Sequence, residues 1–578
     1  MLLVRRMLIV LVVGGLLSSF LALGQVPPPN TGKMSWDLFQ TVAAGQRKRA
    51  VGEEVKTVSA LLITSNAATQ QDLSALKTLG YTILGAFGQF VMVQAPADYF
   101  ADPKSGVDVM DFVSNATLPP VTITSAGEAT PITNGTSAIG TSQVWAHGYH
   151  GQGTKIAVID AGFDPNDPTL AQLDSTFYSV NPTGKGIGAY EAVEGEAAQG
   201  SNHGTSCAII AGDVAPEAKL YLLSYPTTSS FIGWLCALDY AVHTLKVDVV
   251  TTSVEFGYPT CHADGTGPLN EAVDEILAGT NTSLVIAAGN WAQGDRSDRT
   301  FYAGTFTDSD GDYQHDFTSS TDTAWDRNTM RFHAHEGDHI TVILEWDDWA
   351  AIMATQDLDI FLYDAKYHVQ LAYSQAQQFG NETNPVEYFY LDLPYTGDYC
   401  IAIVNHAAKW NNQPVQPVSF HLNLFNQGGQ FDTVEHHTTC GSVREVATSP
   451  GVITVGAISV EDGTVREYSS RGPTAGGIEK PDLYAPDGVT GTLILPFYGT
   501  SASAPYAAGA IALVHSIYPD SSKQEELARL QGRKEESATS SSETGQSGGA
   551  IAQKADTGCT DNCGNPLYRL NLAGIIQE

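Results

Sequence analysis

The sequence predicts an α/β protein with a doubly wound parallel sheet, a small α+β unit before it and an all-β sandwich inserted into it. Apolar strand-like runs alternate with helical patterns over residues 138–299, as parallel sheets require. From 300 to 427 the pattern changes to short strands and turns without a helical period. The strand–helix alternation resumes over 428–520. We therefore expect one sheet, split in sequence, with its site at the carboxyl ends of the strands.

The composition describes a long, acidic chain with enough apolar residues for sizeable cores. Its 578 residues are 43% hydrophobic, and 63 acidic against 29 basic side chains give a net charge of −34. Phosphates would be repelled by such a surface, so we expect no nucleic-acid partner. The charge suits a soluble protein in an extracellular medium, but it does not identify a substrate.

Residues 1–24 predict a signal peptide. Arg5 and Arg6 precede an apolar run, and the small residues Ala22 and Gly24 suit cleavage before Gln25. An uncleaved membrane anchor is the alternative. No other stretch is long enough to span a bilayer. We therefore expect a secreted protein, in the medium or associated with the cell surface, without a stable membrane span after cleavage.

The N-terminal region divides into three parts before the sheet begins. Residues 25–55 are Pro-rich and then polar, as in a linker, and 119–137 form a junction rich in Thr, Pro and Gly. Between them, 56–118 predict a small α+β domain. Its expected elements are strands at 58–64, 80–84 and 90–96 and a helix at 70–79.

Polar residues stand at the ends of the predicted sheet elements. An apolar strand at 156–159 ends in Asp160, and His203 opens a helix of small residues. A strand at 283–288 leads to a turn at Asn290. Further predicted elements are a strand at 247–253 and helices at 233–245 and 269–277.

Ser501 is predicted at a helix N-terminus. A strand-like run and Gly499 precede it, small residues follow it, and Pro505 is expected in the first turn. Unpaired N–H groups and the helix dipole favour negative charge there. A serine in this place is usually only an N-cap. As a nucleophile it needs a base and an orienting carboxylate, and the chain offers both upstream.

Asp160, His203 and Ser501, in this order and with Gly-Thr-Ser-x-x-x-Pro at 499–505, resemble the subtilisin-like serine peptidases (subtilases). The resemblance covers about 138–299 and 428–520, and 557–578 as a last segment. It implies that Ser501 is the nucleophile, His203 the base and then the acid, and Asp160 the orienting carboxylate. It implies Asn290 as an oxyanion-hole donor. The expected activity is endopeptidase hydrolysis of polypeptides through an acyl-enzyme.

The two additional regions also resemble parts of such enzymes. The 56–118 unit is similar to the inhibitor-type propeptide, which implies an autoprocessed zymogen with its own propeptide as intramolecular inhibitor; an ordinary small domain is the alternative. The 300–427 insertion resembles jelly-roll accessory domains through 356–364 and 396–399. A large β-rich loop excursion is the alternative to a true domain.

The resemblance also implies a substrate cleft, for which the matching positions are Ser253, Val254, Glu255, Ala287, Ala288 and Gly289. We hypothesise that Glu255 favours basic or polar substrate residues; the alternative is a side chain that points to solvent. A non-catalytic secreted adhesion or binding protein on the same fold is the alternative function.

Acidic residues and cysteines allow further expectations. Asp308, Asp310, Asp312 and Asp316 are spaced for a structural Ca²⁺, with an acidic turn as the alternative. The chemistry itself requires no cofactor. Export implies that some of the seven cysteines pair; Cys559 and Cys563 are the expected local bridge, and Cys207 a small buried residue. Residues 521–556 are predicted as a low-complexity linker.

Overall fold

The computed structural model describes most of the chain between residues 55 and 533 and a short C-terminal segment. The described residues are 38, 41–42, 55–101, 113–117, 133–196, 201–227, 230–256, 262–319, 323–349, 355–376, 384–411, 414–533, 561, 563–572 and 575–576. The predicted signal peptide lies outside them, as do Cys261, Cys559 and most of the residues predicted as linker and junction.

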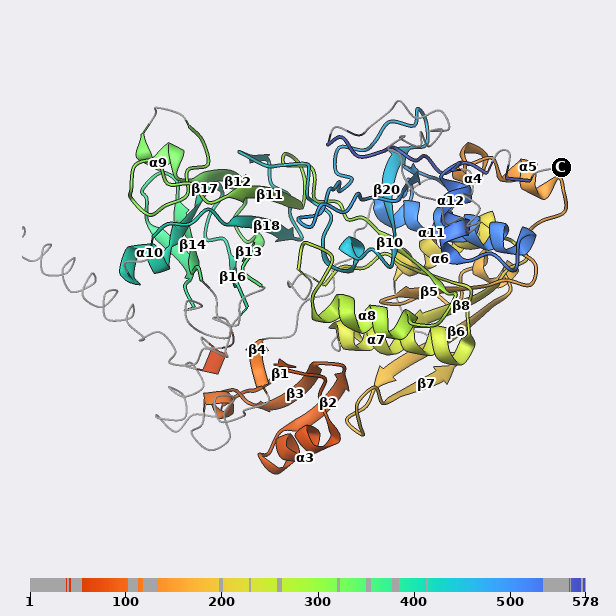
Figure 1. The fold of residues 1–578 in the computed structure, drawn as a ribbon, viewed down its shortest axis with the longest axis horizontal. Coiled ribbons are helices and arrows are strands. Elements are labelled where there is room, and N and C mark those ends of the chain that lie inside the picture. Colours follow the sequence, from red (N-terminus) through yellow and green to blue (C-terminus); the bar gives the residue numbers. More distant parts are fainter. Residues whose placement is uncertain are drawn as a thin grey trace, which may run out of the picture.

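An eight-stranded sheet forms the centre of the larger α/β body (Figure 1). The strand order is β21-β20-β10-β9-β5-β8-β6-β7, and neighbours pair in parallel except for β6 and β7. The strands are β5 (Lys155–Asp160), β6 (Ser175–Pro182), β7 (Tyr190–Glu194), β8 (Lys219–Ser224), β9 (Val249–Thr252), β10 (Ser283–Ala287), β20 (Ile453–Ser459) and β21 (Leu483–Asp487).

Helices cover both faces of this sheet, which confirms the predicted doubly wound α/β fold. On one face, α6 (Asn202–Val214) and α11 (Thr500–Ile517) bury their small residues against the strands. On the other, α7 (Ser230–Asp239), continued by a π-helical segment (Tyr240–Leu245), packs beside α8 (Pro268–Leu277). Short helices α4 (Gly135–Ala138) and α5 (Thr141–Trp145) precede β5.

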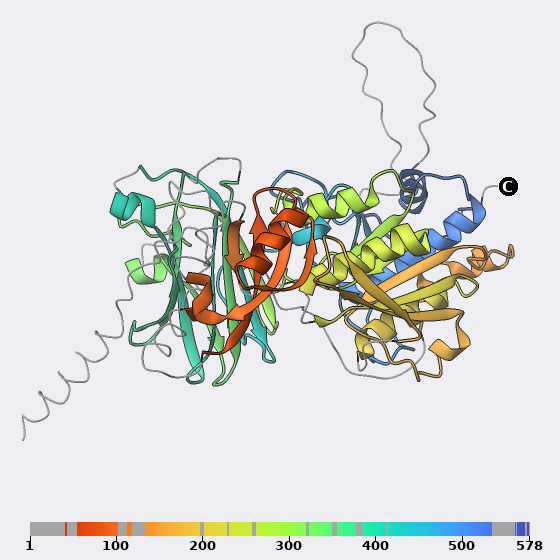
Figure 2. The same cartoon turned by 90° about the horizontal axis from the view of Figure 1, so that it is seen from below.

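The N-terminal unit is a four-stranded antiparallel sheet with one helix, and it has its own core. A capping box between Thr69 and Asp72 starts the helix. The opposite face docks on α7, where the rings of Phe90 and Phe231 lie 4.6 Å apart (Figures 1 and 2). The elements of the N-terminal unit are β1 (Thr57–Thr64), α3 (Gln70–Thr78), β2 (Thr82–Phe87), β3 (Phe90–Pro96) and β4 (Val113–Thr117).

The inserted region is a β-sandwich of two antiparallel sheets, ordered β11-β18-β13-β16 and β15-β14-β17-β12-β19, with a core between them. It is inserted between β10 and β20, which are neighbours in the central sheet. Its elements are β11 (Arg299–Thr305), α9 (Ala324–Arg327), β12 (Met330–Ala334), β13 (His339–Trp346), β14 (Leu358–Asp364), β15 (Gln370–Ser374), β16 (Val386–Asp392), β17 (Gly397–Asn405), α10 (His406–Asn411), β18 (Ser419–Gln427) and β19 (Thr433–Val434).

Part of the predicted 521–556 linker is instead a helix, α12 (Lys523–Leu530). A capping box between Ser522 and Glu525 starts it, and the buried Leu530 fixes it to the core. None of the helices in the described part of the chain combines the length and apolarity that crossing a bilayer requires.

The predicted Cys559–Cys563 bridge is wrong, because Cys563 pairs with Cys440, 123 residues away. The C-terminal segment returns to the edge strand β21, where the Leu570 N–H donates to the Tyr484 carbonyl at 2.8 Å, and this return carries Cys563 to the end of the insertion. Sequence proximity alone does not reveal such a return. Cys207 is buried and unpaired, as expected, and so are Cys236 and Cys400.

Candidate active site

The predicted catalytic residues come together at the carboxyl edge of the central sheet. Asp160 is the last residue of β5, and Asn290 follows β10 by three residues. His203 and Ser501 are each the second residue of a helix, α6 and α11, and these two helices pack against each other. Because parallel strands end at the same edge, side chains distant in sequence converge there.

Asp160 and His203 form a buried pair, only 1% and 4% exposed. The His203 Nδ1 lies 2.7 Å from the Asp160 Oδ2. A carboxylate accepts only, so Nδ1 donates and the neutral ring keeps the lone pair of Nε2 for a proton. Within the described residues Nε2 has no hydrogen-bond partner. This is the tautomer that a general base requires.

Gly204 permits the close approach of α6 to the Asp160 strand. A Cβ atom at this position would lie 2.3 Å from the Gly162 carbonyl oxygen and 2.7 Å from the Cβ of Asp160. Any side chain there would displace His203 from its carboxylate. The helix itself begins with Ser201, whose hydroxyl accepts from the Gly204 N–H at 3.3 Å.

Ser501 lies near the start of α11, but Pro505 is not in the first turn as predicted; it is the sixth residue of the helix. Having no N–H, Pro505 cannot bond the carbonyl of Ser501 four residues earlier. Side chains replace this bond: the Cys207 thiol and the Ser253 hydroxyl donate to the Ser501 carbonyl at 3.4 and 3.3 Å. Because Pro505 leaves the Ser501 carbonyl free, these two bonds attach the Ser501 backbone to α6 and to the segment that follows β9 (Val249–Thr252).

Cys207 lies close to the Asp160–His203 pair. Its sulfur lies within 4.8 Å of ligand atoms of Asp160 and His203. Burial, together with the nearby Asp160 charge, raises the pKa of the Cys207 thiol well above its ordinary value. A thiol kept protonated is a poor nucleophile, so this cysteine serves packing and the bond to Ser501.

Asn290 is held close to Ser501 by Thr500. Its Oδ1 accepts from the Thr500 N–H and hydroxyl, both at 3.0 Å. The Thr500 hydroxyl oxygen in turn accepts from the Gly289 N–H at 3.2 Å. These contacts fix the plane of the Asn290 amide, with its Oδ1 toward Thr500 and its NH₂ on the other side.

Five of the six positions predicted to line a substrate cleft are buried, and Glu255 is the exception. Ser253, Val254, Ala287, Ala288 and Gly289 are all buried. The Glu255 carboxylate accepts from the Trp291 indole N–H at 2.8 Å and pairs with Arg299 at 3.1 Å. The predicted solvent-facing alternative is therefore wrong, and the charge proposed to select basic substrates is already paired within the protein.

Two charged residues, on the segments that lead into and out of the insertion, contact Glu255 and Phe256, and the sequence did not predict either contact. Arg299 begins β11, and its side chain is 3% exposed. Glu445, on the returning segment, accepts the Phe256 N–H at 3.0 Å. The sequence signal that could have found them is a charged residue close to each end of the insertion.

The acidic loop of the insertion contains part of the predicted cation set. Asp308, Asp310 and Asp312 each offer an oxygen, and these lie within 4.8 Å of one another. Asp316 lies outside this group; it accepts from the Ser309 N–H at 2.7 Å and pairs with Arg327 at 2.8 Å, and Arg327 also pairs with Asp310. Three hard oxygens suit Ca²⁺, so three of the four predicted ligands remain candidates.

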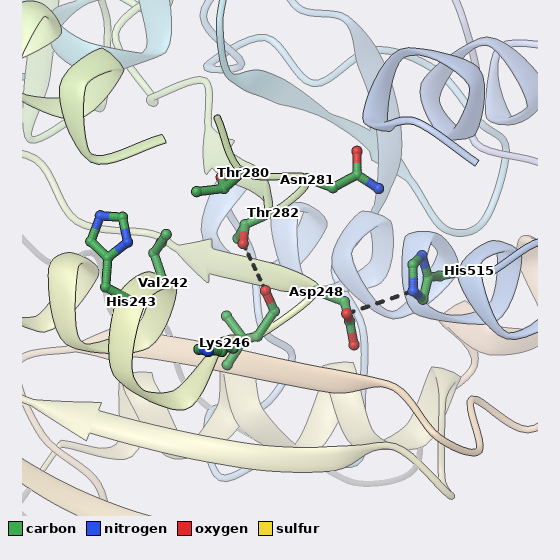
Figure 3. A pocket seen from close by; sticks show the side chains of 9 residues that line it. Val242, His243, Lys246, Asp248, Thr280, Asn281, Thr282 and His515 are labelled. Atoms are coloured by element: carbon green, nitrogen blue, oxygen red, sulfur yellow. Dashed lines mark hydrogen bonds and ion pairs between the residues drawn. The ribbon is translucent and has the colours of Figure 1, made fainter. Parts of the chain in front are cut away.

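A separate pocket of about 320 Å³ lies at the other edge of the sheet (Figure 3). Its lining includes Asp248 and Thr282, which precede β9 and β10, and His515 near the end of α11. His515 is 14 residues beyond Ser501, or roughly 21 Å along the helix. This pocket is therefore not part of the candidate active site.

These features define an α/β protein with an Asp–His pair, a serine at a helix start and an asparagine beside it. The sequence profile of the Subtilase family (Peptidase_S8) matches residues 151–336 and 411–564. Since this match spans more than half of the chain, the chain belongs to the subtilase family.

Two proteins illustrate the similarity. The "Major intracellular serine protease" of Bacillus subtilis (strain 168) is 30% identical over 196 residues, which cover 32% of this chain and 56% of that protein. The chain thus matches about half the length of this relative. The structure of the Clostridium perfringens CspB protease has a TM-score of 0.51 at 15% identity, over 76% of this chain and 98% of the other. This second likeness supports the fold alone.

Proposed function

We propose that the protein is a secreted serine endopeptidase that cleaves polypeptides through an acyl-enzyme intermediate. The observation that carries this proposal is the buried His203, held by Asp160 at 2.7 Å with Nε2 left for a proton, at the edge where α11 brings Ser501. His203 takes the Ser501 proton during attack on the substrate carbonyl and returns it to the leaving amine.

The tetrahedral oxyanion is stabilised by the NH₂ of Asn290 and the backbone N–H of Ser501. In the structure the Ser501 hydroxyl lies 3.5 Å from the Ser253 carbonyl oxygen. It turns to His203 when substrate binds, since catalytic hydrogen bonds tighten in the complex. Loss of one such oxyanion donor lowers kcat by about 10²–10³-fold.

The N-terminal unit acts, in this proposal, as an intramolecular inhibitor that is cut away near the junction. Its separate core and its docking on α7 through Phe90 support this role. The Lys77 ammonium donates to the Gly184 carbonyl at 2.9 Å and the Gly188 N–H to the Ala86 carbonyl at 2.7 Å, so the β6–β7 hairpin also holds the unit.

Self-processing tests both parts of the proposal. The full chain and Ser501→Ala are expressed for export, exposed to a fluorophosphonate probe and weighed by mass spectrometry. We expect the wild type alone to lose the region before about residue 138 and to be labelled at Ser501. Export of an unlabelled, uncut wild type that binds peptides without hydrolysis would instead support the non-catalytic binding protein.

A further inference from the structure

A short loop connects the last sheet strand to the nucleophile helix. It runs from Asp487, the final residue of β21, to Gly499, the N-cap of α11. Val489 and Phe497 pair across it, with N–H to carbonyl distances of 3.2 and 2.7 Å. The Phe497 ring meets the His203 imidazole edge-on, with centroids 5.6 Å apart. The loop thus contacts the general base and leads into the nucleophile.

The Asp487 carboxylate closes this loop at its base. It is fully buried, and its Oδ2 accepts from the Gly499 N–H at 3.0 Å and from the Tyr468 hydroxyl. Its Oδ1 accepts from the Arg466 Nε at 2.5 Å. The Gly499 N–H lies 3.1 Å from the Tyr468 hydroxyl oxygen as well, so two acceptors, this hydroxyl and the Asp487 carboxylate, meet at this one amide.

Gly499 needs this anchor because its backbone is unusual. Its φ of 109° lies in the region that glycine alone adopts readily, and Gly499 has no side chain to cap α11. The turn is therefore held from outside, by a carboxylate that belongs to the sheet. Thr500 and Ser501 follow directly, so the Gly499 amide is one of the points that fix the position of Ser501, beside the bonds between Asn290 and Thr500 and from Cys207 and Ser253 to the Ser501 carbonyl.

A buried carboxylate is an expensive way to hold a turn. Burial raises the pKa of Asp487 to about 6, although the Arg466 charge and the Gly499 N–H act to lower it. A role in overall stability would be served as well by apolar packing. The desolvation of Asp487 is therefore better explained by a need to fix the position of the Gly499 amide next to Ser501.

We propose that Asp487 is a positioning residue for catalysis, which registers the Ser501 turn to the sheet and holds Phe497 against His203. The inference rests on the proposed peptidase function. Asp487 touches neither the substrate nor the reacting atoms; it acts through Gly499 and through the loop. Arg466 and Tyr468 are its supports, and they orient the carboxylate toward the amide.

The test compares Asp487→Asn with a matched control in the full chain. The control is Asp561→Asn, another buried carboxylate that accepts a tyrosine hydroxyl, from Tyr484 at 2.9 Å, and a backbone amide, from Asn565 at 3.0 Å. We expect Asp487→Asn to lower kcat and the fluorophosphonate labelling rate by about 10–100-fold, with KM within about threefold, since small misplacements of reacting groups act on this scale. Asp561→Asn should stay within about threefold of wild type.

Hydrogen exchange provides a second readout that needs no activity. In the Ser501→Ala background, Asp487→Asn should speed exchange of peptides spanning 488–501 and leave β10 unchanged. If Asp487→Asn fails to fold, Tyr468→Phe, which removes one support, should lower kcat several-fold in the same direction. A folded Asp487→Asn variant whose kcat and hydrogen-exchange rates equal those of the protein with Asp487 would overturn the inference. Faster exchange with an unlabelled wild type would instead overturn the proposed function, and the catalytic role of Asp487 with it.

Discussion

Arg299 offers the sharpest test of how the insertion supports the cleft. Its guanidinium pairs with Glu255 at 3.1 Å and with Asp298 at 2.9 Å, and lies over the rings of Trp291 and Phe425 at 5.6 and 5.3 Å. Asp298 is 40% exposed and can be hydrated, whereas Glu255 is 16% exposed. Replacing Arg299 by Met therefore leaves one carboxylate, that of Glu255, nearly desolvated and without its cation.

The expected magnitudes follow from this difference in burial. Removing one partner of a buried pair costs about 3–5 kcal/mol, so Arg299→Met should lower the free energy of unfolding by that amount. Glu255→Gln keeps an oxygen for the Trp291 N–H and leaves Arg299 its Asp298 partner, so its cost should be about 1 kcal/mol. The double variant has no stranded charge and should be more stable than Arg299→Met alone.

Glu255→Gln is therefore expected to change sign with its background, destabilising the wild type and stabilising Arg299→Met. Urea unfolding of the four proteins, all carrying Ser501→Ala to prevent self-digestion, measures this coupling. Coincident fluorescence and circular dichroism transitions would justify the two-state treatment. Equal destabilisation by Glu255→Gln in both backgrounds would refute the reasoning.

Three further predictions concern other parts of the chain. Replacing Cys440 and Cys563 by Ser should cost up to about 5 kcal/mol in urea unfolding, because the bridge closes a loop of 123 residues; a loss below about 1 kcal/mol would contradict this. Burial raises the pKa of Asp487 to about 6 from an ordinary 3.8, so the folded state takes up the proton of Asp487 at a higher pH than the unfolded state does. Between pH 7 and 4 the wild type should therefore gain about 2 kcal/mol over Asp487→Asn, and a constant difference would contradict this. If the Asp308 loop binds Ca²⁺, the ion at 100 times its Kd should stabilise the chain by about 2.7 kcal/mol, and Asp308→Asn should abolish the effect; unchanged melting in EDTA indicates an acidic turn.

Local patterns were sufficient to predict the fold, and the joint resemblance of the motifs to subtilases was needed to nominate the site. Buried strands that end in Asp160 or precede Asn290 are continuous in sequence, and so is the small-residue helix that begins near Ser501. Periodicity reports such elements because each depends on neighbouring residues. The nominated positions lie at one sheet edge in the structure, since the parallel order alone brings their ends together.

What sequence reasoning missed depends on contacts between distant segments. The partner of Cys563 is set by the return of the C-terminal segment to β21, and the orientation of Glu255 by an arginine 44 residues later. The composition of 521–556 predicts a linker, although the capping box of Ser522 and Glu525 indicates a helix start at its beginning. The polar composition of the whole 521–556 segment concealed this short helix.

The place of the insertion explains why its residues reach the site. It leaves the central sheet after β10 and returns before β20, and β10 ends at the edge of the candidate active site, three residues before Asn290. The departing segment therefore carries Arg299 past Glu255, and the returning segment carries Glu445 to Phe256. A sandwich attached at the opposite edge would make neither contact.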